Sequence, residues 1–160
     1  MKTEEFTQRV QRVRERLYRT AYLYLGREHD ALEAVDEAVY RAFRSRFRLR
    51  EAAFFETWIT RVLINLCKDE LRRRNRETLV AAPPEAEASP DRLDSLPLRE
   101  AVAALPEPLR AVVVLRYFTG LTLEETAAAL KIPRGTVSTR QKRALELLRL
   151  ELTEEEEENL

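Results

Sequence analysis

The stretch GLTLEETAAALKIPRGTVSTRQKRALELLR, residues 120–149, decides the fold of the C-terminal part of this chain. Thr122 and Glu125 have the spacing of a capping box, in which two side chains satisfy backbone N–H groups at the start of a helix. This spacing predicts a helix that begins at Thr122 and runs to about Leu130.

A turn and a second helix follow. Residues 131–135 combine Pro with Gly and are predicted to form a turn. Thr136 then opens a final helix that we expect to end near Leu150. Two helices joined by a short turn that contains Gly form the helix-turn-helix pattern of many DNA-binding proteins.

The final helix has two different faces. Val137, Ala144 and Leu148 lie on one face and must pack on the preceding helices. The N-terminal end of the other face carries hydroxyl and basic groups, and in DNA-binding proteins this end enters the major groove. The candidate DNA contacts are Arg134, Thr136, Ser138, Thr139, Arg140, Lys142 and Arg143. The motif alone leaves open a helical hairpin with a solvated basic face.

The composition favours helix throughout. Ala, Leu, Glu and Arg dominate, only three of the 160 residues are Gly, and 35% are charged. Val, Ile and Thr form none of the alternating runs that strands show, so we expect an all-α protein. The formal net charge is zero but segregated: net +5 over residues 1–78, −3 over 79–97, +4 over 98–150 and −6 over 151–160. Two basic blocks are a reason to consider nucleic acid as a partner.

A segment rich in Pro, Ala and Glu divides the chain. Residues 79–91 contain three prolines and break every helical periodicity, which is typical of a linker. We expect two small helical domains, a helical bundle over residues 1–77 and a helix-turn-helix bundle over 96–152. A flexible linker over 78–95 joins them. An acidic tail over 153–160 follows, and we expect it to be frayed and solvated.

Three or four helices are expected in the N-terminal domain, the first three over residues 4–25, 30–47 and about 53–76. Apolar side chains recur at three- and four-residue spacing in the second and third, which predicts one buried stripe on each. The stripes consist of Leu32, Val35, Val39, Ala42 and Phe43, and of Phe55, Ile59, Val62, Leu63, Leu66 and Cys67. In the C-terminal domain, helices are expected over 98–104 and 109–118 ahead of the helix-turn-helix.

Catalytic, metal and membrane sites are not indicated. Cys67 is expected to be a buried hydrophobe, and the lone His29 has no neighbouring ligand for a metal. The chain has no Gly-rich phosphate loop and no GxSxG, so we expect no enzyme activity, cofactor or small-molecule substrate. No apolar run reaches membrane-spanning length and the N-terminus lacks a signal-peptide pattern, so we expect a cytoplasmic protein without membrane insertion.

Three segments together resemble the sigma-70 family of transcription initiation factors. EETAAALKIPRGTVSTRQKRALELLR is similar to that family's promoter −35-binding region, in which Gly-Thr-Val and a later Arg-Ala recur, here at 135–137 and 143–144. HDALEAVDEAVYRAF, residues 29–43, resembles the core-binding helix. FFETWITRVLINLCKDELRRRNR, residues 54–76, resembles the melting and −10 recognition segment. Two such modules with only a linker between them resemble the extracytoplasmic function (ECF) subgroup.

The resemblance implies a sigma factor that binds core RNA polymerase and promoter DNA and assists strand opening. On the second helix it implies that an acidic and aromatic face docks on core polymerase. That face consists of Asp30, Glu33, Asp36, Glu37 and Tyr40. Taken alone, one such helix face would more simply be interpreted as solvated.

On the third helix the resemblance implies contacts with −10 DNA. Basic and amide groups would hold one strand, an aromatic ring would support unstacking, and the Arg cluster would bind phosphates. The contacts implied are Trp58, Arg61, Asn65, Lys68, Arg72, Arg73, Arg74 and Arg76. Phe54 is a further stacking candidate, Phe55 is expected in the core, and Trp58 fits either role.

Three positions depart from the family pattern. Many relatives have Lys or Arg where Ser138 stands, an apolar residue where Gln141 stands, and Gln where Asp36 stands. Gln141 therefore places a polar group at the edge of the packed face of the final helix. Because Ser138 alters the reading face, a promoter sequence cannot be transferred from relatives.

The resemblance also implies an anti-sigma factor that occludes the two modules. Two other functions stay open from the residues themselves: a helix-turn-helix regulator that works without polymerase, and an adaptor that binds proteins only. A further hypothesis is that residues 154–158, EEEEE, compete with DNA phosphate for the basic face.

Overall fold

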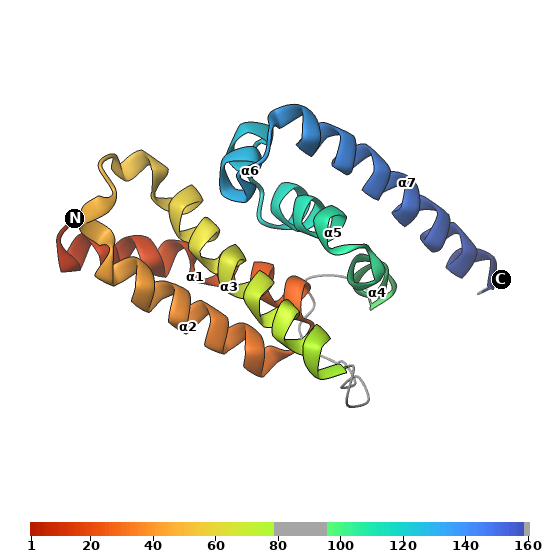
Figure 1. The fold of residues 1–160 in the computed structure, drawn as a ribbon, viewed down its shortest axis with the longest axis horizontal. Coiled ribbons are helices and arrows are strands. Elements are labelled where there is room, and N and C mark those ends of the chain that lie inside the picture. Colours follow the sequence, from red (N-terminus) through yellow and green to blue (C-terminus); the bar gives the residue numbers. More distant parts are fainter. Residues whose placement is uncertain (79–95, 159–160) are drawn as a thin grey trace. The chain divides into compact units, whose positions relative to one another are not determined.

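The computed structural model describes residues 1–78 and 96–158, and every regular element in these ranges is helical (Figure 1). The chain forms two compact units, Met1–Ala88 and Ser89–Leu160, which we describe one at a time. The prediction of an all-α protein with two helical domains is confirmed. The predicted linker falls mainly on residues 79–95, which lie outside the described residues.

The first unit is built from three long helices, α1 (Thr3–Leu25), α2 (Glu28–Arg44) and α3 (Phe55–Thr78). Each of the three packs on the other two. Gly26 ends α1 in the left-handed conformation, with φ of 75°, and its N–H group donates to the Tyr22 carbonyl at 2.7 Å. Such a turn suits Gly, which has no Cβ to clash there.

The core of the first unit lies where the three helices meet. Leu17 and Tyr24 of α1 and Phe55 of α3 are each 1% exposed. Phe6 packs its ring edge-on against Phe43 and Phe55, with centroids 5.4 and 5.7 Å apart. The predicted core position of Phe55 is confirmed.

Helix α2 differs from its predicted form in two ways. Leu32, expected on the buried stripe, is 44% exposed, and the small side chains of Ala31 and Ala38 are fully buried instead. Close packing against α1 and α3 explains this, because alanine lets helix backbones approach. The helix also ends at Arg44 and not near residue 47, and a short 3₁₀ turn, η1 (Arg46–Arg48), follows.

The second unit contains α4 (Leu96–Ala104), α5 (Glu107–Val113), a π-helical turn η3 (Val114–Phe118), α6 (Leu123–Leu130) and α7 (Arg134–Glu158). Helices α4, α5 and α6 all pack on α7. Val112 of α5 and Val137 and Ala144 of α7 are fully buried, so the apolar face predicted for α7 is its core face.

The capping box that opens α6 is confirmed. The Glu125 N–H donates to Thr122 Oγ1 at 3.1 Å, and the Thr122 N–H donates to Glu125 Oε1 at 2.9 Å. The following turn is shorter than predicted. Lys131 ends α6 with φ of 56°, and α7 begins at Arg134, because the carbonyl of Pro133 already accepts from the Thr136 and Val137 N–H groups. Gly135 therefore lies in the first turn of α7.

Helix α7 is also longer than predicted. Its backbone stays helical to Glu158, whereas the sequence predicted an end near Leu150 and a frayed tail. No helix in the described parts of the chain is both long enough and apolar enough to cross a membrane.

Candidate nucleic-acid interface

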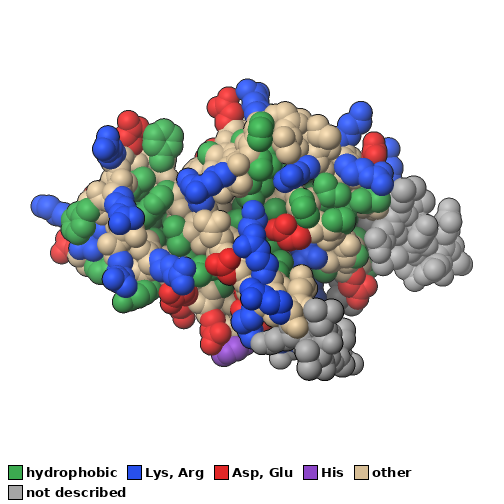
Figure 2. All heavy atoms as spheres, in the orientation of Figure 1, with side chains coloured by type: hydrophobic (Ala, Val, Ile, Leu, Met, Phe, Trp, Pro, Cys, Tyr) green, Lys and Arg blue, Asp and Glu red, His purple; other side chains and the backbone are tan. Residues whose placement is uncertain are grey.

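The N-terminal half of α7 presents polar side chains to solvent. Ser138, Thr139, Lys142 and Arg143 are exposed, whereas Val137 and Ala144 on the opposite side are fully buried. Arg134 is also exposed, and Thr136 and Arg140 are half-buried. Figure 2 shows mainly Lys and Arg side chains, with exposed apolar groups, along the visible side of α7. The seven predicted −35 contacts are therefore brought together on one helix end, five of them openly exposed.

Two of the cations on α7 form exposed ion pairs with nearby carboxylates. Arg134 Nη1 lies 3.2 Å from Glu124 Oε1, and Arg143 Nη1 lies 3.5 Å from Glu146 Oε2, with every side chain in these pairs more than half exposed. Exposed ion pairs of this kind contribute about 0–1 kcal/mol. A DNA phosphate can therefore replace either carboxylate at little cost.

The outer side of α3 carries the second predicted DNA surface. Asn65, Arg72, Arg73 and Arg76 are exposed, while Trp58, Arg61 and Lys68 are half-buried. The Trp58 ring is tilted against Phe55, with centroids 6.0 Å apart, so one side of the indole packs on the core. Arg73 bonds Glu70, and Arg72 lies 3.6 Å from Asp69.

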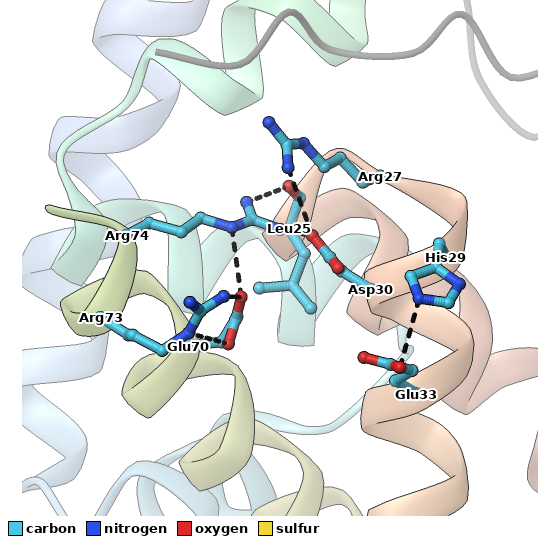
Figure 3. A network of polar contacts seen from close by, with 8 residues as sticks. All are labelled: Leu25, Arg27, His29, Asp30, Glu33, Glu70, Arg73 and Arg74. Atoms are coloured by element: carbon cyan, nitrogen blue, oxygen red, sulfur yellow. Dashed lines mark hydrogen bonds and ion pairs between the residues drawn. The ribbon is translucent and has the colours of Figure 1, made fainter. Parts of the chain in front are cut away.

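Arg74 and Asp30, each predicted as a contact residue, are mostly buried and pair with each other. The sequence placed Arg74 among the phosphate contacts and Asp30 on the polymerase-binding face. In the structure their side chains are 16% and 19% exposed, and they form an ion pair with each other (Figure 3). Arg74 also donates to the Leu25 carbonyl at 2.6 Å. Both residues are therefore occupied in holding α1, α2 and α3 together.

Glu70 belongs to the same network. It accepts hydrogen bonds from Arg73 at 2.6 and 3.0 Å, and Arg74 Nε lies 3.5 Å from its carboxylate (Figure 3). The hydrogen bond from Arg73 is the main reason that the pKa of Glu70 lies below its usual value, and Arg74 adds to the effect. Nearby Cys67 is fully buried, and burial raises the pKa of its thiol to about 12. The expected buried hydrophobe is confirmed.

The remaining members of the acidic face on α2 are exposed. Glu33, Asp36 and Glu37 have side chains 69%, 65% and 48% exposed, and Tyr40 is 55% exposed. Each acid has one basic neighbour, at 2.5 Å for Asp36 and Arg14, 3.2 Å for Glu33 and His29, and 2.9 Å for Glu37 and Arg41. The exposed Leu32 adds an apolar group to this face.

Sequence reasoning missed Phe47, in the segment between α2 and α3, although it named Phe54 as a stacking candidate. Phe47 and Phe54 are 72% and 58% exposed, the largest exposures among the aromatic rings singled out in the described residues. Arg46 lies over the rings of Phe43 and Phe47, 4.0 and 4.3 Å from their centroids. The alternating Arg residues of RSRFRLR, 44–50, are the available signal, but the predicted second helix runs to residue 47 and so includes Phe47.

An apolar hollow lies beside the basic face of α7. It has a volume of about 390 Å³ and is lined by side chains that include Leu98, Tyr117, Phe118 and Leu145. A second hollow of about 490 Å³ shares Leu145 and is also lined by Lys142 and Arg143. A partner seated on the apolar surface would therefore lie next to the candidate DNA contacts. Within residues 1–78 and 96–158, no cluster of three potential metal ligands occurs.

Comparisons with known protein families agree with this division into two units. Residues 9–77 match the family described as Sigma-70 region 2, and residues 101–150 match Sigma-70, region 4. Among curated proteins, RNA polymerase sigma factor SigV of Bacillus subtilis is 31% identical over 145 residues, which cover 87% of this chain and 86% of SigV. ECF RNA polymerase sigma factor SigE of Mycolicibacterium smegmatis is 36% identical over 146 residues. These cover 84% of this chain but only 56% of that relative.

Two solved structures share the fold. The sigma factor RpoE in complex with the anti-sigma factor NepR from Bartonella quintana superposes with a TM-score of 0.82 at 22% identity, over 94% of this chain and 98% of that one. CnrH in complex with the cytosolic domain of CnrY superposes with a TM-score of 0.73 at 23% identity, over 95% of this chain and 90% of that one.

Proposed function

The chain belongs to the ECF subgroup of the sigma-70 family of RNA polymerase sigma factors, as its sequence predicted, and we propose that it directs promoter-specific transcription initiation. It binds core RNA polymerase with the first unit, recognises −10 DNA with the same unit, and recognises the −35 element with the second. The observation that carries this proposal is the exposed polar end of α7. On the opposite face of this helix, Val137, Ala144 and Leu148 are buried, and the preceding helix α6 begins with a capping box.

Recognition of the −35 element falls to the N-terminal turns of α7. Arg143 and Lys142 are long exposed cations next to the exposed hydroxyl groups of Ser138 and Thr139. Arg can bind guanine through two hydrogen bonds, and hydroxyls can bond base edges or phosphates. Arg134, at the start of the helix, is placed to bind the phosphate backbone.

Recognition of the −10 element falls to α3 and the segment before it. Arg72, Arg73 and Arg76 supply positive charge for phosphates, and Arg61, Asn65 and Lys68 line the same helix. The exposed rings of Phe47 and Phe54 are platforms on which separated bases can stack, which lowers the cost of opening the duplex. Trp58 has a smaller part, because its ring packs partly on Phe55.

Core polymerase binds the exposed face of α2, formed by Leu32, Glu33, Asp36, Glu37 and Tyr40. An acidic face with an apolar group at one end and an aromatic group at the other suits a partner surface that is basic and partly apolar. Catalysis belongs to the polymerase, so this chain needs no catalytic group, cofactor or small-molecule substrate of its own. It acts in the cytoplasm, where the polymerase transcribes DNA.

An anti-sigma factor is a further proposed partner. One solved structure that shares the fold is a sigma factor bound to an anti-sigma factor, and another is CnrH bound to the cytosolic domain of CnrY. The apolar hollow around Leu145 and Tyr117 adjoins Lys142 and Arg143. A protein bound there would cover the −35 contacts, and Leu145→Asp would release transcription from its inhibition.

Run-off transcription with purified core polymerase on a promoter library tests the proposal. Addition of the protein should yield specific start sites preceded by shared −35 and −10 elements. Absence of specific starts would contradict the proposed function. Nanomolar binding to an operator without polymerase would instead support the regulator that works alone, which the family membership does not favour.

A further inference from the structure

Gln141 interrupts the apolar face of α7. In a helix, residues 137, 141, 144 and 148 fall on one stripe, and Val137, Ala144 and Leu148 in this stripe are buried. Gln141 is half-buried and places an amide between them. A hydrogen-bond partner within the protein stabilises a polar group at such a position.

Arg116 supplies that partner. Its Nε–H group donates to Gln141 Oε1 at 2.9 Å, and its Nη1 donates to the Leu121 carbonyl at 2.8 Å. Arg116 is itself half-buried, so a hydrogen bond from its charged group is stronger than one between neutral groups in water. One guanidinium therefore joins the segment after α5, the residue before the capping box of α6, and the N-terminal third of α7.

The backbone around Arg116 is unusual. Residues Val114–Phe118 form a π-helical turn, in which the Thr119 N–H donates to the Val114 carbonyl five residues earlier, at 2.9 Å. Such turns widen the helix by one residue and occur often at functional sites. Here the widened turn is the part of the chain that carries Arg116, whose guanidinium bonds Gln141 of α7.

We propose that the Arg116–Gln141 contact is a positioning device that sets the orientation of the reading helix α7 relative to α6, and through it the discrimination among −35 sequences. Gln141 lies directly before Lys142 and one turn after Ser138, so a small rotation of α7 at this point moves both candidate contacts. Neither Arg116 nor Gln141 needs to touch DNA for this effect. The inference rests on the proposed role of α7 as the −35 reader.

The test uses the full-length protein with core polymerase on a promoter library whose −35 element is randomised and whose −10 element is fixed. The quantity measured is the ratio of transcripts from the preferred −35 sequence to those from its single-base variants. Gln141→Met, which removes the acceptor at nearly constant length, should lower this ratio by about fivefold, as should Arg116→Gln. The salt dependence of promoter binding should stay unchanged, because the phosphate contacts remain.

Two further variants separate positioning from general stability. Gln141→Glu keeps an oxygen acceptor for Arg116, so it should lower overall DNA affinity through its charge but preserve the discrimination ratio. Arg110→Gln is the matched control, because Arg110 donates to the carbonyls of Ala103 and Leu105 near the end of α4. It should leave the ratio unchanged even where it lowers thermal stability.

The outcomes distinguish this inference from the function on which it rests. If the wild-type holoenzyme prefers particular −35 sequences and Gln141→Met retains the full preference, the positioning role is wrong and the reading role stands. An equal loss of discrimination in Arg110→Gln and Arg116→Gln would also overturn it. If the wild-type holoenzyme shows no −35 preference, the assignment of α7 as the reader fails, and the inference with it.

Discussion

Arg74 of α3 is the ion-pair partner of Asp30 of α2, and its guanidinium also donates to the carbonyl of Leu25, the last residue of α1. Carbonyl groups at a helix C-terminus lack a partner within the helix, and Arg74 supplies one. A single side chain therefore joins the ends of the three helices that form the first unit.

Arg74→Ala should destabilise the first unit by about 1–3 kcal/mol, because it removes the hydrogen bond to the Leu25 carbonyl and leaves the partly buried Asp30 carboxylate with Arg27 alone, 3.9 Å away. Arg73→Ala is the control, since Arg73 is 57% exposed and its pairing with Glu70 should contribute less than about 1 kcal/mol. Urea unfolding followed by circular dichroism measures both. Equal losses in the two variants would show that the buried pair has no special role.

Arg143→Ala should weaken binding to the preferred −35 element by about 1–3 kcal/mol and relax its sequence preference, while core association stays intact. Promoter binding by the holoenzyme and core binding by the free protein are the two measurements. A loss that is the same for every −35 sequence would indicate that Arg143 contacts phosphate only.

Glu37→Arg should weaken binding to core polymerase and leave −35 recognition intact, because it places a cation at the centre of the acidic face on α2. Binding to core polymerase should fall by at least tenfold, equivalent to about 1.4 kcal/mol. The isolated protein should keep its weak affinity for −35 DNA. Glu5→Arg, a charge reversal at an exposed site on α1, is the control and should leave core binding near the wild-type value.

Thr122→Ala should destabilise the second unit by about 1 kcal/mol, because the Glu125 N–H loses its acceptor at the start of α6. Thr122→Ser retains the hydroxyl and should behave as the wild type. Thermal unfolding provides the comparison. An equal shift of Tm in both variants would mean that the methyl group, and not the cap, is responsible.

Cys67 should make the protein sensitive to alkali. Its pKa is about 12 in the folded state against an ordinary value of 9.0, so the unfolded chain loses the thiol proton first. The buried protonated thiol therefore contributes its full stabilisation below pH 9. As the pH rises from 9 toward 12, the free energy of unfolding should fall by about 1.4 kcal/mol per pH unit. Urea unfolding of wild type and Cys67→Ala across this range measures the difference. Identical pH dependence in the two proteins would contradict a buried thiol.

Deletion of residues 153–160 should leave DNA affinity nearly unchanged at physiological salt. Along a continuous α7, residue 154 lies about 16 Å from Arg143, roughly twice the screening length of about 8 Å. The hypothesis that EEEEE competes with phosphate requires the end of α7 to unwind. A tenfold rise in affinity for DNA on deletion would indicate that the end of α7 unwinds in the intact protein.

The features that follow from local sequence rules were predictable. The capping box at Thr122, the end of α1 at Gly26 and the buried face of α7 each depend on a few neighbouring residues. The limits of α7 were not, because Pro133 allowed the helix to start early and no breaker stands between Leu150 and Glu158. Ile64, fully buried, lay outside the predicted stripe because α3 packs on both α1 and α2 and buries two sides.

The candidate site was predictable in composition but not in every contact. The exposure of the cations on α7 and α3 could be predicted, because these residues lie outside the apolar stripe of each helix. The pairing of Arg74 with Asp30 joins residues 44 positions apart, and neither has a local signal that separates it from its exposed neighbours. The exposure of Phe47 depends on where α2 ends, which Ser45 decides by leaving the helical conformation.

Because α7 is long, a small change of its tilt at one end moves the other end by a larger distance. Its 25 residues extend about 37 Å, and the turns that would touch DNA are at one end. A tilt of about 10° at that end displaces the other end by about 6 Å, a change that energy transfer to a dye on the promoter can resolve. Because the only native thiol is buried, a cysteine introduced at the C-terminal end of α7 would be the single site of dye labelling. The distance from this dye to the dye on the promoter would then report how the tilt of α7 differs between −35 sequences.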